Sequence, residues 1–238
     1  MATFALVPGA WGGAWAWQWL VPHLRDRGHE VHSVALSGLG ERVDLAHAGI
    51  TLDTHITDVV TALAFADLRD VILVGTSYGG MIIAGVTDQV PERLAQVIYL
   101  DATVPADGQS FYDAWLGGAE MQASEQQEAE AAGTPGFLPP PVGWIEEAVA
   151  DAAIRTVMLT RLTPHPLATW TQPIRLTNPN AARVPHTYIC CTVTSEPDPP
   201  YLTRIRADPD WNYVEIPFDH LAPVTAPRET AMALAALA

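Results

Sequence analysis

The stretch best suited to chemistry is Gly-Thr-Ser-Tyr-Gly at residues 75–79. It follows the apolar run 71–74, and a second apolar run with helical character begins at Met81. This order predicts a strand, a sharp turn and a helix, with Ser77 at the apex of the turn. Glycine on either side allows a turn too tight for a Cβ atom. Ser77 is therefore a candidate nucleophile, although an ordinary glycine-rich turn containing serine would read the same.

A serine hydroxyl is a weak nucleophile until a base removes its proton. His220 is the candidate base, because it lies between the last predicted strand, 211–216, and the final predicted helix, 225–237. The alternative is a histidine in a surface loop. Of the remaining histidines, His165 could line a substrate pocket or have a structural role.

The carboxylate that should orient the base has two candidate positions. The usual one, in the loop after the strand expected at 186–193, holds Ser195 instead of an aspartate, although Glu196 and Asp198 are close. Asp101 is the other, because it ends the strand that follows the nucleophile's helix and can approach the base from there. We predict Asp101 as the acid and keep Asp198 or Glu196 as alternatives. A dyad without an acid is left open.

An ester or amide substrate would also need two N–H donors for the oxyanion that forms on its carbonyl oxygen. One should be the backbone N–H of Tyr78, directly after the serine. The other should come from the turn after the first strand, 3–7, and is the N–H of Ala10 or Trp11. Glycines at 9, 12 and 13 would let this backbone approach a substrate closely. A plain strand-to-helix turn is the alternative interpretation.

Strand-like and helix-like runs alternate in the parts of the chain that must position these residues. Such alternation predicts an α/β fold, with a doubly wound, mainly parallel sheet of about six strands and sites at the carboxyl ends of the strands. Strands are expected at 3–7, 30–36, 71–74, 95–100, 186–193 and 211–216, and helices at 14–27, from 52, from 77 to 89, at 199–207 and at 225–237.

The composition changes between residues 104 and 185. Prolines cluster at 139–141, and Gln, Glu and Ala dominate 120–132. The segment is too long for a loop, so we predict a helical lid, with a helix at 143–162, inserted into a core of residues 1–103 and 186–238. Its candidate pocket residues could equally form the core of the lid; they are Trp115, Phe137, Trp144, Met158, His165 and Trp170.

The composition restricts the partners and the compartment. The net charge is −15, and all 12 basic side chains are arginines, so nucleic acid, an anionic membrane and Schiff-base chemistry are not expected. No apolar run has the length of a membrane span, and the N-terminus reads as a strand, not a signal peptide. The adjacent Cys190 and Cys191 are expected to be reduced, as in a cytoplasmic protein. We expect a small-molecule substrate and no metal, and a homodimer is left open.

Several motifs together resemble the α/β-hydrolases, in the branch that contains plant methylesterases, hydroxynitrile lyases and related bacterial esterases. They are Phe-Ala-Leu-Val-Pro-Gly-Ala-Trp-Gly-Gly-Ala-Trp from residue 4, Gly-His-Glu-Val at 28–31, Ser-Gly-Leu-Gly-Glu-Arg at 37–42, Val-Gly-Thr-Ser-Tyr-Gly-Gly-Met at 74–81 and the loop around His220. The resemblance implies hydrolysis of small esters through a covalent acyl-serine, with no cofactor. It also implies a helical lid over a buried apolar pocket.

The chain departs from the pattern of this family at several positions. Pro8 stands where the first turn often has histidine, and Thr76 stands where histidine often precedes the nucleophile. Leu221 replaces the lysine that follows the catalytic histidine of hydroxynitrile lyases, which argues against cyanohydrin cleavage by that mechanism. Ser77 excludes a dehalogenase or an epoxide hydrolase, because both need an aspartate nucleophile.

Two other functions are left open by the sequence. One is a lyase, cyclase or rearrangement enzyme of small-molecule metabolism that uses His220 for proton transfer. The other is a non-catalytic, ligand-binding protein on the same fold.

Overall fold

The computed structural model describes residues 1–115, 118–193 and 198–238, and within them six strands form one sheet. Their order across the sheet is β2-β1-β3-β4-β7-β8, and every neighbouring pair is parallel. The strands are β1 (Thr3–Val7), β2 (Glu30–Ser33), β3 (Val71–Ser77), β4 (Leu94–Ala102), β7 (His186–Cys191) and β8 (Trp211–Ile216). The predicted α/β architecture is confirmed.

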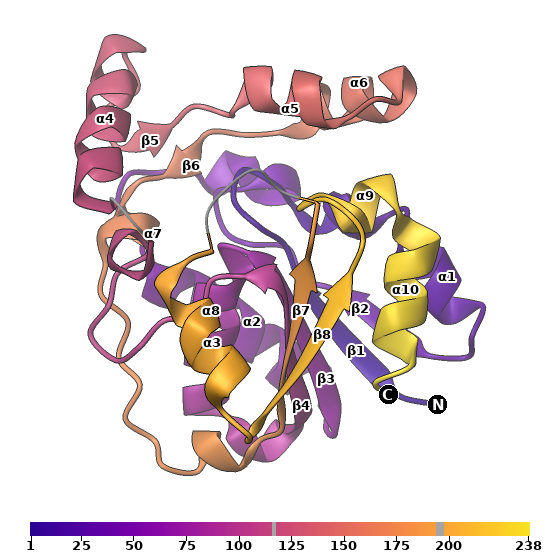
Figure 1. The fold of residues 1–238 in the computed structure, drawn as a ribbon. Coiled ribbons are helices and arrows are strands. Elements are labelled where there is room, and N and C mark those ends of the chain that lie inside the picture. The colour runs from indigo at the N-terminus through magenta and orange to yellow at the C-terminus, as the bar shows by residue number, and fades with distance from the viewer. Residues whose placement is uncertain (116–117, 194–197) are drawn as a thin grey trace.

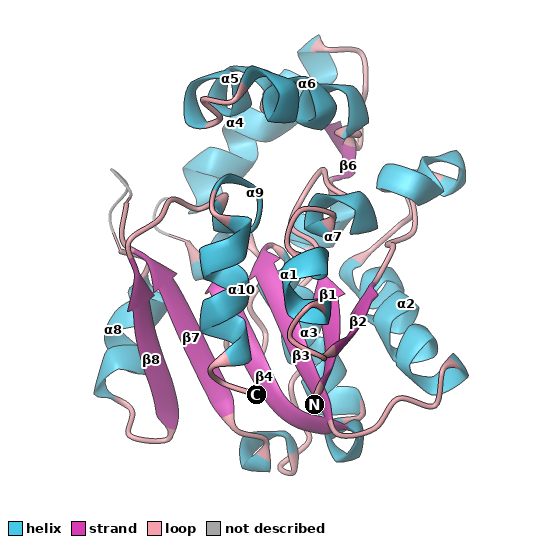
Figure 2. Cartoon of the chain, turned by 90° about the vertical axis from the view of Figure 1, so that its right-hand side faces the viewer, coloured by secondary structure: helices cyan, strands magenta, loops and turns pink. Residues whose placement is uncertain are grey.

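Helices cover both faces of this sheet (Figure 2). One face packs against α1 (Val21–Arg25) and α10 (Pro227–Ala235), and the other against α2 (Leu52–Phe65), α3 (Gly79–Gln89) and α8 (Pro200–Ala207). Successive residues of a strand point to opposite faces, so both sets of side chains are buried. In β1, Phe4 and Leu6 belong to one core and Ala5 and Val7 to the other, which explains the uninterrupted apolar run.

Three predicted helices are each broken in two, at points where a new helix begins. The expected helix 14–27 is a 3-10 helix, η1 (Ala14–Trp17), and then α1, which has a proline in its first turn. The expected helix 225–237 is mostly α10, which begins at Pro227, and its first residue, Thr225, ends a separate short helix, α9 (Ala222–Thr225). Proline has no N–H to donate, so it starts a helix more easily than it continues one.

The third break lies between α5 (Val142–Ala148) and α6 (Ala152–Arg161), where one helix was expected. The Asp151 carboxylate accepts hydrogen bonds from the N–H groups of Ala153 and Ile154, at 2.8 and 3.0 Å. This N-cap satisfies backbone donors that the preceding helix would otherwise have to bond, so a second helix starts there.

The chain between β4 and β7 is here called the insertion. Its residues 118–166 lie beyond the carboxyl ends of the strands, and residues 172–185 then run back to the amino end of β7 (Figure 1). A two-stranded antiparallel sheet within the insertion pairs Leu138 with His165, and the sequence did not predict this sheet. The elements of the insertion are α4 (Gly118–Ala131), β5 (Phe137–Leu138), α5, α6, β6 (His165–Pro166) and α7 (Ala168–Thr171). The further 3-10 helices are η2 (Gly40–Leu45), η3 (Pro91–Arg93), η4 (Tyr112–Ala114) and η5 (Ala181–Arg183).

Among the helices of the described residues, none combines the length and the apolar character needed to cross a membrane. The longest of them, α2 and α4, have 14 residues each.

Candidate active site

The turn between β3 and α3 holds Ser77 in a strained backbone conformation. Its φ is 54°, in the left-handed region that non-glycine residues rarely adopt. The two flanking glycines are required by close contacts. A Cβ on Gly75 would lie 2.7 Å from the carbonyl oxygen of Gly79, and a Cβ on Gly79 would lie 2.8 Å from that of Pro8. The turn therefore places the Ser77 side chain at the carboxyl end of the central strands.

Asp101 follows the same pattern at the end of the next strand, with a φ of 46°. One carboxylate oxygen, Oδ1, accepts the backbone N–H of Cys191 at the end of β7, at 3.1 Å. The other, Oδ2, lies 2.6 Å from Nδ1 of His220. A backbone donor on one side thus fixes the carboxylate so that its second oxygen faces the histidine.

The loop after β8 brings His220 to this carboxylate. Asp219 Oδ1 accepts the backbone N–H of Leu221 at 2.8 Å and the hydroxyl of Thr225 at 3.0 Å, which ties the loop to α9. With its Nδ1–H donated to a carboxylate, the neutral His220 ring carries a lone pair on Nε2. The side chain is 31% exposed, so solvent and substrate can reach this end of the site.

The alternative acids are placed elsewhere. Asp198 forms an ion pair with Arg206 of α8. Glu196 lies outside the described residues, as does Ser195. Among the described residues, Asp101 is the carboxylate that contacts the His220 ring.

The turn after β1 lies against Ser77. A Cβ on Gly9 would lie 3.0 Å from Cβ and 3.6 Å from Oγ of Ser77, so only glycine allows this approach. Trp11 donates its backbone N–H to Nδ1 of His165 at 3.2 Å. The backbone N–H groups of Ala10 and Tyr78 make no hydrogen bond with any described residue. Of the two donors predicted in this turn, the N–H of Ala10 therefore remains available.

Comparisons with known proteins show the family of the chain. Residues 4–233 match the model of the "Alpha/beta hydrolase family". The chain belongs to the α/β-hydrolase family.

Relatives of this α/β-hydrolase include enzymes from bacteria and plants. It is 34% identical to a carbendazim hydrolyzing esterase of Nocardioides sp. (strain SG-4G), over the full length of both chains. It is 35% identical to an alpha-hydroxynitrile lyase of Arabidopsis thaliana, over 43% of this chain and 40% of that one. An extracellular α/β-hydrolase of a Paenibacillus species superposes with a TM-score of 0.85 at 25% identity, over 99% of this chain and 98% of that one.

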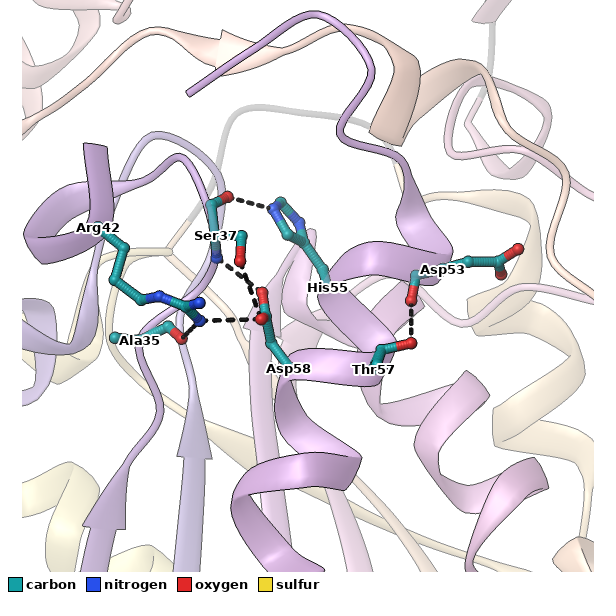
Figure 3. A network of polar contacts seen from close by, with 7 residues as sticks. All are labelled: Ala35, Ser37, Arg42, Asp53, His55, Thr57 and Asp58. Carbon is teal, nitrogen blue, oxygen red and sulfur yellow. Dashed lines mark hydrogen bonds and ion pairs between the residues drawn. The ribbon is translucent and has the colours of Figure 1, made fainter. Parts of the chain in front are cut away.

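A buried polar network in this α/β-hydrolase supports Tyr78, the residue after the serine. The Tyr78 hydroxyl lies 3.0 Å from Nδ1 of His55, and Nε2 of His55 lies 2.9 Å from the carbonyl oxygen of Ser37. A carbonyl can only accept, so His55 carries its proton on Nε2 and accepts from Tyr78 on Nδ1. The N–H and hydroxyl of Ser37 both donate to Asp58, which also pairs with Arg42 (Figure 3).

Burial shifts the pKa of both partners in this contact toward the neutral form. Desolvation lowers the pKa of His55 to about 4 and raises that of Tyr78 well above its usual value. The contact is therefore a hydrogen bond between two uncharged side chains near neutral pH.

By exposure, the predicted pocket residues fall into three groups: exposed, half-buried and buried. Trp144 is near the candidate base, with its ring 6.0 Å from that of His220, and is 41% exposed. Trp115 donates its indole N–H to Thr103 at 3.1 Å, and Phe137 is half-buried in β5. The other three are buried; they are Met158, His165 and Trp170.

His55 and Thr163 are polar residues near the site that the sequence interpretation missed. The spacing of His55 gave a signal, because it falls on the buried face of α2 with Leu52, Ile56 and Val59. Thr163 gave none, because its contacts with Trp11 join residues 152 positions apart.

Within the described ranges, no cluster of three or more His, Cys, Asp or Glu side chains could hold a metal ion. Cys190 and Cys191 are buried and unpaired with each other, and burial raises the pKa of both thiols. Their sulfurs are therefore protonated and poorly reactive near neutral pH.

Proposed function

We propose that the protein is a serine hydrolase that cleaves a small, apolar or aromatic carboxylic ester through an acyl-serine intermediate. The observation that carries the proposal is the 2.6 Å contact of Asp101 with His220, at the end of the sheet where the strained turn presents Ser77. The full-length similarity to a carbendazim hydrolyzing esterase and the partial similarity to a methylesterase of Arabidopsis thaliana support ester hydrolysis.

In the first half of the reaction, Nε2 of His220 takes the proton of the Ser77 hydroxyl as Oγ attacks the ester carbonyl carbon. Asp101 stabilises the imidazolium that forms. The N–H groups of Ala10 and Tyr78 donate to the oxyanion of the tetrahedral intermediate. When the intermediate collapses, the imidazolium gives its proton to the departing alcohol, and an acyl-serine remains.

In the second half, a water molecule attacks the acyl carbon and His220 removes its proton. Collapse of the second tetrahedral intermediate returns the proton to Ser77 and releases the carboxylic acid. In this proposal, residues 104–185 form a cap that limits access of water to the site. The ring of Trp144 beside His220 would contact an apolar group of the substrate.

The test is hydrolysis of p-nitrophenyl acetate and butyrate by the wild type and by Ser77→Ala. We expect kcat to fall at least about 1,000-fold, because only the oxyanion hole and binding remain. Mass spectrometry should detect an acyl adduct on the Ser77 peptide of the wild type. Ser33→Ala in β2 is the matched control and should keep kcat. Equal rates for wild type and Ser77→Ala would contradict the mechanism.

A further inference from the structure

Trp11, in the turn that approaches Ser77, is held by the insertion through three groups. Its backbone N–H donates to Nδ1 of His165 at 3.2 Å. Its carbonyl oxygen accepts the backbone N–H of Thr163 at 3.0 Å, and its indole N–H donates to the carbonyl oxygen of Leu138 at 3.3 Å. Trp11 is thus hydrogen-bonded to both strands of the small sheet, β5 and β6, and to Thr163 just before β6.

The conformation that these bonds hold is unfavourable by itself. Trp11 has a φ of 59°, in the left-handed region. A non-glycine residue stays in this region only where its surroundings fix it. The bonds to the insertion provide that constraint, so the shape of the turn depends on residues more than 120 positions away in the sequence.

The hydrogen-bond partners of His165 determine which ring nitrogen accepts. Its Nε2 lies 2.8 Å from the hydroxyl oxygen of Thr169, and that hydroxyl donates to the carbonyl oxygen of Pro166 at 2.8 Å. Because the Thr169 proton is used on Pro166, the His165 proton must be on Nε2, where it is donated to Thr169. The lone pair of Nδ1 is then free to accept from Trp11.

Packing holds this ring in place. His165 is fully buried, and burial lowers its pKa well below the usual value, so the ring is neutral. The rings of Tyr78, Trp170 and His55 surround it at centroid distances of 4.8, 5.6 and 6.1 Å. Figure 2 shows β6 beyond the carboxyl ends of the strands, near α7.

We propose that His165 is a positioning residue for the oxyanion hole, because its Nδ1 fixes the peptide plane between Ala10 and Trp11. The neighbouring peptide carries the Ala10 N–H that should donate to the oxyanion. The two peptide planes meet at the Cα atom of Ala10, so loss of the bond to His165 would let the turn relax and the Ala10 donor shift away from the substrate. The inference rests on the proposed function. It implies that the oxyanion hole stabilises the transition state only when the insertion is packed against the turn after β1.

The decisive experiment compares two amides at this position. In His165→Asn the side-chain oxygen can take the place of Nδ1 and accept from Trp11. In His165→Gln the amide is one methylene further out, near the place of Nε2, and that acceptor is lost. With p-nitrophenyl butyrate, we expect His165→Gln to lower kcat at least about tenfold with KM nearly unchanged, because only the transition state needs the donor. His165→Asn should restore most of kcat.

An inhibitor gives a second readout that a merely structural role would not change. An alkyl trifluoromethyl ketone adds to the serine and forms a tetrahedral oxyanion, so its Ki should rise by the same factor as kcat falls.

If His165→Gln does not fold, Thr169→Val replaces it. Thr169→Val removes the acceptor for Nε2–H, so the ring can shift its proton to Nδ1 and release Trp11. We expect kcat to fall about threefold to tenfold.

The outcomes separate this proposal from the function on which it rests. An inert wild type would overturn the proposed function and the role of His165 with it. An active wild type with unchanged kcat and Ki in folded His165→Gln, or in folded Thr169→Val, would overturn only the role of His165. Equal losses of kcat in His165→Asn and His165→Gln would overturn it too, because they would show a packing effect unrelated to the acceptor.

Discussion

The two sides of the site hold imidazole rings in opposite ways. On the side of β4, β7 and β8, the His220 ring contacts the carboxylate of Asp101 and is 31% exposed. On the side of β1 and α2, the rings of His55 and His165 are fully buried, and their partners are hydroxyl, carbonyl and amide groups.

This difference separates a group that can exchange a proton from groups that can only hold a hydrogen bond. A carboxylate partner stabilises the imidazolium, so a ring beside it can take a proton and return it. A buried ring with neutral partners has no such stabilisation, and desolvation opposes its charging. Burial and partner chemistry, not residue type, therefore decide what each histidine can do.

Removing the charge on the first side should have the largest effect. Asp101→Asn keeps the shape of the side chain but replaces the carboxylate that fixes the Nδ1–H form of His220. We expect kcat for p-nitrophenyl butyrate to fall about 1,000- to 10,000-fold, as for other Ser-His-Asp sites.

Asp198→Asn is the matched control for this prediction. It removes the ion pair with Arg206, an exposed contact, and should change kcat by less than about twofold. A larger loss of kcat in Asp198→Asn than in Asp101→Asn would show that the acid is in the loop after β7. The contrast between the two sides would then be wrong.

Sequence patterns were sufficient for the sheet. Every expected strand overlaps an observed one, because strands buried on both faces need uninterrupted apolar runs such as residues 71–74. The helix breaks at Pro22, Asp151 and Pro227 were missed, although each residue is a known helix-starting signal. The apolar periodicity continues through these breaks, so by itself it predicts one helix where the chain forms two.

The site was only partly predictable for a geometric reason. Ser77 stands out because its motif is local, and Asp101 because it ends a strand beside the nucleophile. Whether Asp101 or Asp198 reaches His220 depends on how two loops fold, which residue spacing does not determine. The contacts of His165 and Thr163 with Trp11 join residues 154 and 152 positions apart, so no local pattern reports them.

The next prediction concerns His55, a buried and uncharged ring on the side of β1 and α2, and its effect on the free energy of unfolding. His55 has a pKa of about 4 in the folded protein and about 6.5 when unfolded. The unfolded chain therefore binds a proton between these values while the folded chain does not, so acidification favours unfolding. We expect this residue to lower the free energy of unfolding by about 3 kcal/mol between pH 6.5 and pH 4.

Urea denaturation across this pH range gives the measurement. His55→Gln cannot be protonated, so its stability should depend less steeply on pH than that of the wild type. His47→Gln, at an exposed position, is the control and should keep the wild-type slope. If the free energy of unfolding changed with pH by the same amount in the wild type and in His55→Gln, the His55 ring would not be held neutral. The contrast between the two sides of the site would then be wrong.

The smallest expected effect concerns the loop that holds His220. Asp219 accepts hydrogen bonds from Leu221 and Thr225, so Asp219→Ala should loosen the loop around His220. Two lost hydrogen bonds at a partly exposed site correspond to about 1–2 kcal/mol, and we expect kcat to fall several-fold. Asp219→Asn keeps an acceptor oxygen and should retain more of kcat. Both hydrogen-bond partners of Asp219 among the described residues are uncharged. A full loss of activity in Asp219→Asn would therefore show that its charge also acts on His220, and the acid function would then be shared between Asp101 and Asp219.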